Sequence, residues 1–239
     1  MADALYEAER ICKVCEEKIH VTKVRSRLIT EKQDSDFCMH YRDVNPYYYS
    51  VWVCPNCGYA AQEAEFGEIS STAVELVKKF LAGREVSVDF SGIRTREQAI
   101  ATYKLAIFFA GLTKQQNSKL AGLYLRLGWL YREGEQEEEE QLALAKAAEL
   151  FDAAMAKERF PIGGMSELNL LYLVGELLRR TGKAEQSLLY FNKVVSNPQA
   201  KFEKRLMDMA RDAWHAAREE RDRLKRLAGE EVSEEQLGE

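Results

Sequence analysis

Long apolar segments are missing from this chain of 239 residues. A membrane-spanning helix needs about 20 consecutive apolar residues, and no run in the sequence approaches that length. The opening residues, MADALYEAERICKVC, also lack the basic stretch followed by an apolar stretch that marks a secretory signal peptide. We therefore expect a cytoplasmic protein with no membrane partner.

Positively charged residues are outnumbered by negatively charged ones. The chain has 34 Lys and Arg residues against 39 Asp and Glu residues, which gives a net charge of -5. Proteins that bind nucleic acid usually carry a basic domain or a basic stripe. The acidic balance therefore argues against nucleic acid as a partner.

Two common signatures of catalysis are absent as well. The chain has only 3 histidines, and they form no Ser-His-Asp pattern. It has no glycine-rich loop of the kind that cradles phosphate groups. These absences favour a non-catalytic protein over an enzyme.

Proline is scarce and unevenly placed. Residues 56–160 contain none, so long helices meet no obstacle there. Before about residue 60, the segments 19–24 and 47–53 are rich in β-branched and aromatic residues, which is typical of short strands. After it, apolar residues recur at helical spacing. The sequence predicts a mainly α protein with a small N-terminal β part.

Local signals predict where several helices begin. Residues 72–75 and 95–98 each fit the capping box, in which a threonine and a residue three places later satisfy each other's backbone N–H groups. Residues 83–93, which include two glycines, are expected to form a connection. Asn197-Pro198 predicts the start of a last helix that ends at about residue 228.

The helical part has the spacing of tetratricopeptide repeats, in which small residues let two antiparallel helices approach each other. The better copy comprises Leu171, Val174, Gly175, Leu178, Gly182, Ser187, Phe191 and Val194. A longer copy comprises Tyr124, Leu127, Gly128, Tyr131, Ala147, Phe151 and Ala154, and its extra length coincides with residues 133–141. An ordinary helical bundle is the alternative. We predict a zinc-ribbon-like domain at 1–66, a tetratricopeptide-like domain at 67–228 and an acidic tail at 229–239.

Cysteine spacing carries the strongest chemical signal. Four of the 5 cysteines form two C-x-x-C pairs, Cys12 with Cys15 and Cys54 with Cys57. Two such pairs supply the four thiolates of a closed tetrahedral zinc site, and closed sites are structural. The spacer between the pairs is longer than the usual 15–20 or so residues, which requires an insertion. A redox dithiol is the alternative, although the βαβ context typical of thioredoxin-like pairs is missing.

The fifth cysteine, Cys38, lies between the two pairs. In an extended chain, the neighbouring Asp34, Asp36 and His40 would share one face with it. The simplest interpretation is a half-buried strand with a packed thiol, because cysteine is often buried. A second metal site or reactive site and an alternate ligand for the first zinc are the other two interpretations.

Four motifs together resemble the bacterial family called domain of unknown function 2225. They are Cys12-x-x-Cys15, Asp34-Ser-Asp-Phe-Cys38, Asn45-Pro46-x-Tyr48-Tyr49 and Cys54-Pro-x-Cys57-Gly58-Tyr59-Ala60. The resemblance covers about residues 5 to 215. It implies a bacterial cytoplasmic protein with a zinc-ribbon-like N-terminal part and a tetratricopeptide-like C-terminal part, and it brings no activity with it.

The repeat pattern also predicts a partner surface. In tetratricopeptide-like arrays the first helix of each hairpin lines a concave face. Aromatic and arginine side chains dominate interface energetics, so the predicted partner-binding residues are Trp129, Arg132, Tyr172 and Arg179. Alternatively, the two aromatic side chains pack between helices.

These observations favour a non-catalytic zinc-binding protein with a helical-repeat surface for a protein or peptide partner. A nucleic-acid-associated zinc ribbon is one alternative. An enzyme that uses Cys38 with Asp34, Asp36 or His40 is the other. The sequence predicts no oligomeric state.

Overall fold

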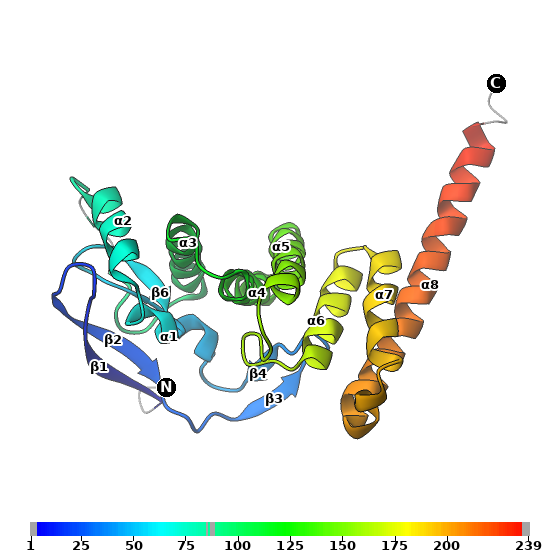
Figure 1. Cartoon of the computed structure of the whole chain (residues 1–239), viewed down its shortest axis with the longest axis horizontal. Helices are drawn as coiled ribbons and strands as arrows, with labels where there is room; N and C mark the ends of the chain where they lie inside the picture. The colour runs from blue at the N-terminus through cyan, green and yellow to red at the C-terminus, as the bar shows by residue number, and fades with distance from the viewer. Residues whose placement is uncertain (1–3, 85, 87–88, 236–239) are drawn as a thin grey trace. The chain divides into compact units, whose positions relative to one another are not determined.

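A computed structural model describes residues 4–84, 86 and 89–235 of the chain. Most of these residues are helical, and three two-stranded antiparallel sheets lie in the N-terminal part (Figure 1). By its internal contacts the chain divides into two compact units, residues 1–150 and 151–239. The domain boundary between residues 66 and 67 stays a prediction.

Each sheet of the first unit is a hairpin. The pairs are β1 (Leu5–Ile11) with β2 (Lys18–Val24), β3 (Thr30–Gln33) with β4 (Met39–Tyr41), and β5 (Val51–Val53) with β6 (Ala60–Gln62). The strand predicted at 19–24 is confirmed. Only the end of the segment 47–53 is a strand, because Asn45 caps a 3-10 helix over Pro46–Tyr49 by accepting a hydrogen bond from the Tyr47 N–H.

The helices of the first unit follow the third hairpin. They are α1 (Glu63–Phe66), α2 (Ser71–Leu81), α3 (Arg96–Leu112), α4 (Asn117–Glu133) and α5 (Glu137–Lys157), the last of which continues past residue 150. Thr95 and Gln98 form the predicted capping box at the start of α3. The box predicted at Thr72 is wrong, because Ser70 caps α2 and Thr72 lies inside the helix. Of the predicted connection 83–93, residues 85 and 87–88 lie outside the described residues.

The third hairpin shares its core with α3. The centroid of the Tyr59 ring lies 5.3 Å from the ring centroid of Phe66 and 5.4 Å from that of Phe109. The fully buried Tyr103 of α3 donates a hydrogen bond to the Tyr47 carbonyl at 3.0 Å. The cysteine-bearing hairpins therefore have no separate core, which explains why the compact unit extends far beyond residue 66.

The second unit contains α6 (Glu167–Arg180), α7 (Ala184–Val195) and α8 (Lys204–Glu235). The last helix was expected to begin at Asn197-Pro198, and this expectation is wrong. Asn197 caps a 3-10 helix over Pro198–Phe202 instead, and α8 starts after it. The helix continues to Glu235, into the segment predicted as an acidic tail, and residues 236–239 of that tail lie outside the described residues.

Two glycines stand where neighbouring helices pack closely. A Cβ atom on Gly128 of α4 would lie 2.6 Å from Leu144 Cδ2 of α5. A Cβ atom on Gly175 of α6 would lie 2.8 Å from Phe191 Cε1 of α7. Both distances are shorter than packed atoms tolerate. The two helices of each pair can therefore approach this closely only because glycine has no Cβ atom.

We predict that Gly175→Ala destabilises the protein by about 1–3 kcal/mol, because the added methyl group displaces Phe191 in a filled core. The measurement is urea unfolding followed by circular dichroism. Gly111→Ala is the matched control, since Gly111 is also helical and its added Cβ would meet nothing within 4 Å. Equal stability of Gly175→Ala and wild type would contradict the close packing of α6 on α7.

Candidate metal centre

The first C-x-x-C pair occupies the turn between β1 and β2. The Cys12 N–H donates to the Glu17 carbonyl at 3.0 Å, and the Glu16 N–H donates to the Cys12 carbonyl at 2.8 Å. Glu16 has φ +66°, the left-handed conformation that lets the chain reverse directly after Cys15. The turn therefore points both thiols in the same direction.

The second pair repeats this turn between β5 and β6. The Cys54 N–H donates to the Tyr59 carbonyl and the Gly58 N–H donates to the Cys54 carbonyl, each at 2.8 Å. Gly58 has φ +78°, as expected for a glycine directly after the last cysteine. The two turns are equivalent in their hydrogen bonds, although only one of them contains glycine.

The two turns bring their four sulfurs together into what we call the four-cysteine cluster. The Sγ atoms of Cys12, Cys15, Cys54 and Cys57 all lie within 4.8 Å of one another. The Sγ atoms of Cys12 and Cys57 are 3.8 Å apart, and those of Cys15 and Cys54 are 3.6 Å apart. Cys12 and Cys54 are buried, while the other two cysteines are partly exposed. The cluster could hold a metal ion such as zinc.

The electrostatics of the cluster favour a bound cation. Hydrogen bonds from the thiols of Cys54 and Cys57 lower the pKa of Cys12. The same contact with Cys12 raises the pKa of Cys54 and that of Cys57. One thiolate therefore suppresses ionisation of its neighbours. A divalent cation removes this conflict because it stabilises all four thiolates at once.

Cys38 belongs to a different group of side chains. It lies with Asp34 and His40 in a cluster whose possible ligand atoms are all within 4.8 Å of one another, here called the Asp34 cluster. The sequence predicts one extended strand through these residues, and this prediction is wrong. Phe37 has φ +68° and closes a turn between β3 and β4, so Asp34 and Cys38 face each other across a hairpin.

Asp36 is not part of that cluster and is fully buried against α4. It accepts hydrogen bonds from Trp129 Nε1 at 3.0 Å and from Arg132 Nη2 at 2.6 Å. Arg132 also contacts Asp34 at 3.0 Å and Glu140 at 2.7 Å. Burial raises the pKa of Asp34, but hydrogen bonds from His40 and Arg132 outweigh burial and lower that pKa to about 2.

The four residues predicted to contact a partner all have contacts inside the protein. Trp129 is 8% exposed and Tyr172 is 1% exposed. Arg179 forms an ion pair at 2.7 Å with Glu176, which is fully buried. Arg132 holds the carboxylates described above. Their partner-binding role stays a prediction.

Sequence reasoning missed the contacts between α4 and the N-terminal segments. Glu133 begins the segment 133–141 that lengthens one repeat copy, and it accepts hydrogen bonds from Asn45 and from the Tyr48 hydroxyl, each at 2.9 Å. Asp36 and Arg132 are 96 positions apart in the chain. Such distant pairs leave no periodic signal in the sequence.

We predict that Cys57→Ser abolishes tight metal binding at the four-cysteine cluster and unfolds the β1–β2 and β5–β6 hairpins, because structural zinc contributes directly to folding free energy. The measurement is the thiolate-to-metal charge-transfer absorption of the cobalt-loaded protein. Cys38→Ser is the control and should keep the absorption of the four-thiolate site. Retention of that absorption in Cys57→Ser would contradict the assignment.

A second prediction concerns Arg132. Arg132→Ala should destabilise the protein by about 3–5 kcal/mol, because removing one partner of a buried ion pair leaves Asp36 as an uncompensated buried charge. The measurement is urea unfolding, with Arg211→Ala in the exposed surface of α8 as the control. If both variants are as stable as wild type, the Asp36–Arg132 contact does not hold the β3–β4 hairpin on α4.

In the described part of the chain, no helix has the length and apolar character needed to cross a membrane.

The model of the family described as "Uncharacterized protein conserved in bacteria (DUF2225)" matches residues 5–217. The chain is also similar to an "Uncharacterized protein" of Borreliella burgdorferi, with 29% identity over 136 residues, which cover 50% of this chain and 49% of the relative. The chain thus spans about half the length of that relative. No solved structure matches. Because the family model covers most of the sequence and includes both cysteine pairs, the chain belongs to the bacterial family DUF2225.

Proposed function

We propose that this protein is a non-catalytic cytoplasmic zinc protein whose helical-repeat surface binds a protein or peptide partner. The observation that carries the proposal is the donor set of the four-cysteine cluster. Four thiolates complete the tetrahedral shell of zinc and leave no open position for a substrate, as in structural sites. Thiolate ligands also suit a reducing compartment, where disulfides are rare.

A tetratricopeptide-like arrangement is the second element of the proposal. The helix pairs α4–α5 and α6–α7 are each joined by a short turn and each pack through a glycine, Gly128 or Gly175. Both glycines occupy the small-residue position of the repeat pattern in the sequence. This agreement supports two repeat-type hairpins rather than an ordinary bundle.

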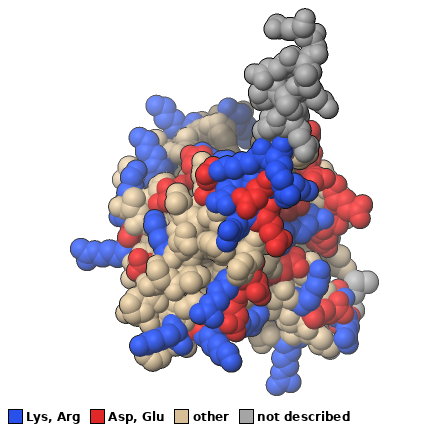
Figure 2. Space-filling view, turned by 90° about the vertical axis from the view of Figure 1, so that its right-hand side faces the viewer, with Lys and Arg blue, Asp and Glu red and all other residues tan. Residues whose placement is uncertain are grey.

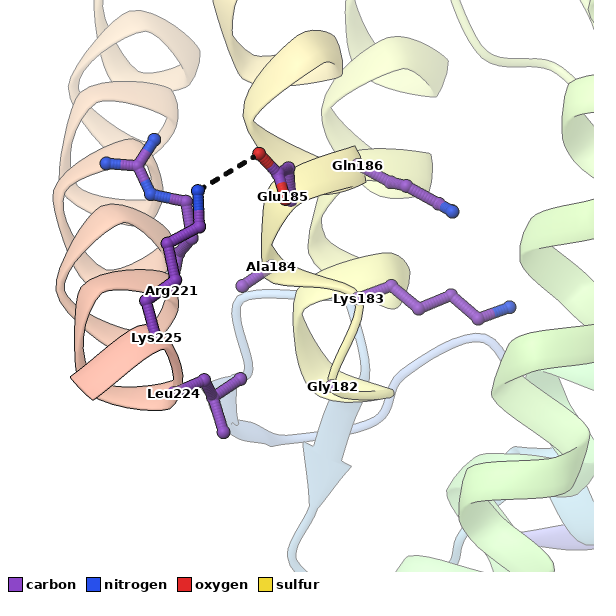
Figure 3. Close-up of a pocket in the computed structure, with 8 residues that line it drawn as sticks. All are labelled: Gly182, Lys183, Ala184, Glu185, Gln186, Arg221, Leu224 and Lys225. Atoms are coloured by element: carbon purple, nitrogen blue, oxygen red, sulfur yellow. Dashed lines mark hydrogen bonds and ion pairs between the residues drawn. The ribbon is translucent and has the colours of Figure 1, made fainter. Parts of the chain in front are cut away.

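The partner surface that we propose to test lies in the second unit, between the start of α7 and α8. A groove of about 330 Å³ is lined there by Gly182, Lys183, Ala184, Glu185, Gln186, Arg221, Leu224 and Lys225 (Figure 3). We prefer it to the four predicted residues for a first test, because substitution of those residues would also disturb contacts within the protein.

An apolar stripe on α8 continues into this groove. Leu206, Ala210, Ala213 and Ala217 follow a four-three-four spacing, and all four are buried. Leu224 and Leu227 continue the stripe one heptad further along, yet they are 43% and 50% exposed. A stripe with this period is the type of surface that an amphipathic helix of a partner covers.

The charges around the groove argue against the nucleic-acid alternative. Lys225 forms an ion pair with Glu185 at 3.4 Å, and Arg221 forms one with Asp222 at 2.6 Å. Lysine, arginine and acidic side chains lie beside one another over the face that Figure 2 shows. Such a mixed surface lacks the positive field that phosphate groups need. The enzyme alternative is also disfavoured, because Cys38 is only 5% exposed.

We predict that Leu224→Glu with Leu227→Glu abolishes recovery of the partner when the full chain is used as bait in crosslinked cells of its host. A charge on each exposed leucine makes burial of the stripe unfavourable. The unfolding temperature should change little, because both side chains are already exposed. The measurement is quantitative mass spectrometry of the captured proteins.

Leu189→Glu on α7 is the matched control, since Leu189 is also an exposed leucine, at 61%, and it does not line the groove. It should capture the partner as wild type does. Equal capture by the double variant would place the partner surface elsewhere. Conversion of a wild-type dimer into a monomer by the double variant would identify the occupant as a second copy of the chain.

A further inference from the structure

We propose that Asp34, Cys38 and His40 form a second site, for a divalent transition metal ion, separate from the four-cysteine cluster. The site goes beyond the function proposed above. Their possible ligand atoms converge within 4.8 Å of one another, and His40 Nε2 already lies 2.8 Å from Asp34 Oδ2. All three residues belong to one short hairpin, β3–β4 and its turn.

The backbone of that hairpin fixes the relative positions of the three residues. The Asp34 N–H donates to the Cys38 carbonyl at 2.8 Å, and the Phe37 N–H donates to the Asp34 carbonyl at 3.0 Å. A positive φ is unfavourable for a bulky residue such as Phe37, so the surrounding structure must hold the turn in this conformation. The ligand set is therefore preorganised, which lowers the entropic cost of binding a metal.

The chemistry of the donors selects the class of metal. Thiolate, imidazole and carboxylate together suit Zn²⁺ and its neighbours in the first transition row. Ca²⁺ and Mg²⁺ prefer shells made only of oxygen ligands. Three protein ligands leave one position of a tetrahedral site open, which distinguishes this site from the closed four-cysteine cluster.

The charges around the hairpin also favour a cation. The carboxylates of Asp34, Asp36 and Glu140 are 16%, 0% and 14% exposed, and they surround the single guanidinium of Arg132. Lys32 reaches Asp34 at 3.3 Å, but its side chain is 64% exposed and water screens its charge. This group of side chains therefore carries more buried negative charge than positive charge, and a divalent ion offsets the difference.

Arg132 is suited to orient the carboxylate ligand. Its Nη1 atom donates to Asp34 Oδ2 at 3.0 Å from the α4 side of the hairpin. Partners of this kind hold ligating side chains in place around metal ions. The metal ion would replace the direct contact between His40 and Asp34, while Arg132 keeps its position. The site therefore connects the β3–β4 hairpin to α4 through one ordered set of contacts.

The test is a titration of the metal-free, reduced full chain with Co²⁺ alone, followed by native mass spectrometry and absorption spectroscopy. We expect the wild type to bind a second cobalt ion after the four-thiolate site is filled. His40→Ala should weaken this second step by on the order of 100-fold or more, because it removes a ligand. Cys38→Ser should weaken it as well, and both variants should keep the first step.

His20→Ala is the matched control, because His20 is an exposed histidine on β2, outside the Asp34 cluster. It should bind both ions as wild type does. The proposal is overturned if the wild type binds only the ion with the four-thiolate spectrum and His40→Ala changes neither step. It is also overturned if only one ion binds and a thiol reagent modifies Cys38 rapidly, since Cys38 would then act as a reactive thiol.

Discussion

Convergence of four cysteine sulfurs is the constraint on which the arrangement of the cysteine-bearing hairpins depends. The Sγ atoms of the four-cysteine cluster are too close for all of them to ionise without a cation. Two turns with the same hydrogen bonds deliver these atoms from segments that lie far apart in the sequence. The hairpins contribute buried side chains such as Val21, Val51 and Tyr59 to a core that they share with α3, so they depend on α3 as well as on the sulfur cluster.

The local parts of this structure could be predicted from the sequence. Cysteine spacing predicted the four-cysteine cluster, and the capping box at Thr95 predicted the start of α3, because both signals act over a few residues. The position of Asp36 could not be predicted, because its partner Arg132 is distant in the chain. The strand expected through Cys38 was wrong for a local reason, since Phe37 adopts a conformation that its residue type does not signal.

The same distinction applies to the helices. Repeat spacing correctly placed Gly128 and Gly175 at helix contacts, because packing between neighbouring helices follows a fixed period. Repeat spacing could not indicate which of the remaining helix faces pack against other parts of the protein. Tyr172 and Trp129 have the size and amphipathic character of interface residues, and these properties suit a protein core equally well.

The buried contact between Asp36 and Arg132 also has an evolutionary consequence. Either residue alone would be a buried charge with too little compensation, so a sequence that loses one of them is under strong selection to lose the other. Lysine is a poor substitute for Arg132. The planar guanidinium donates hydrogen bonds to three carboxylates in fixed directions, and the compact ammonium group of lysine does not reproduce that geometry. Across the family, positions 36 and 132 should therefore change together or not at all.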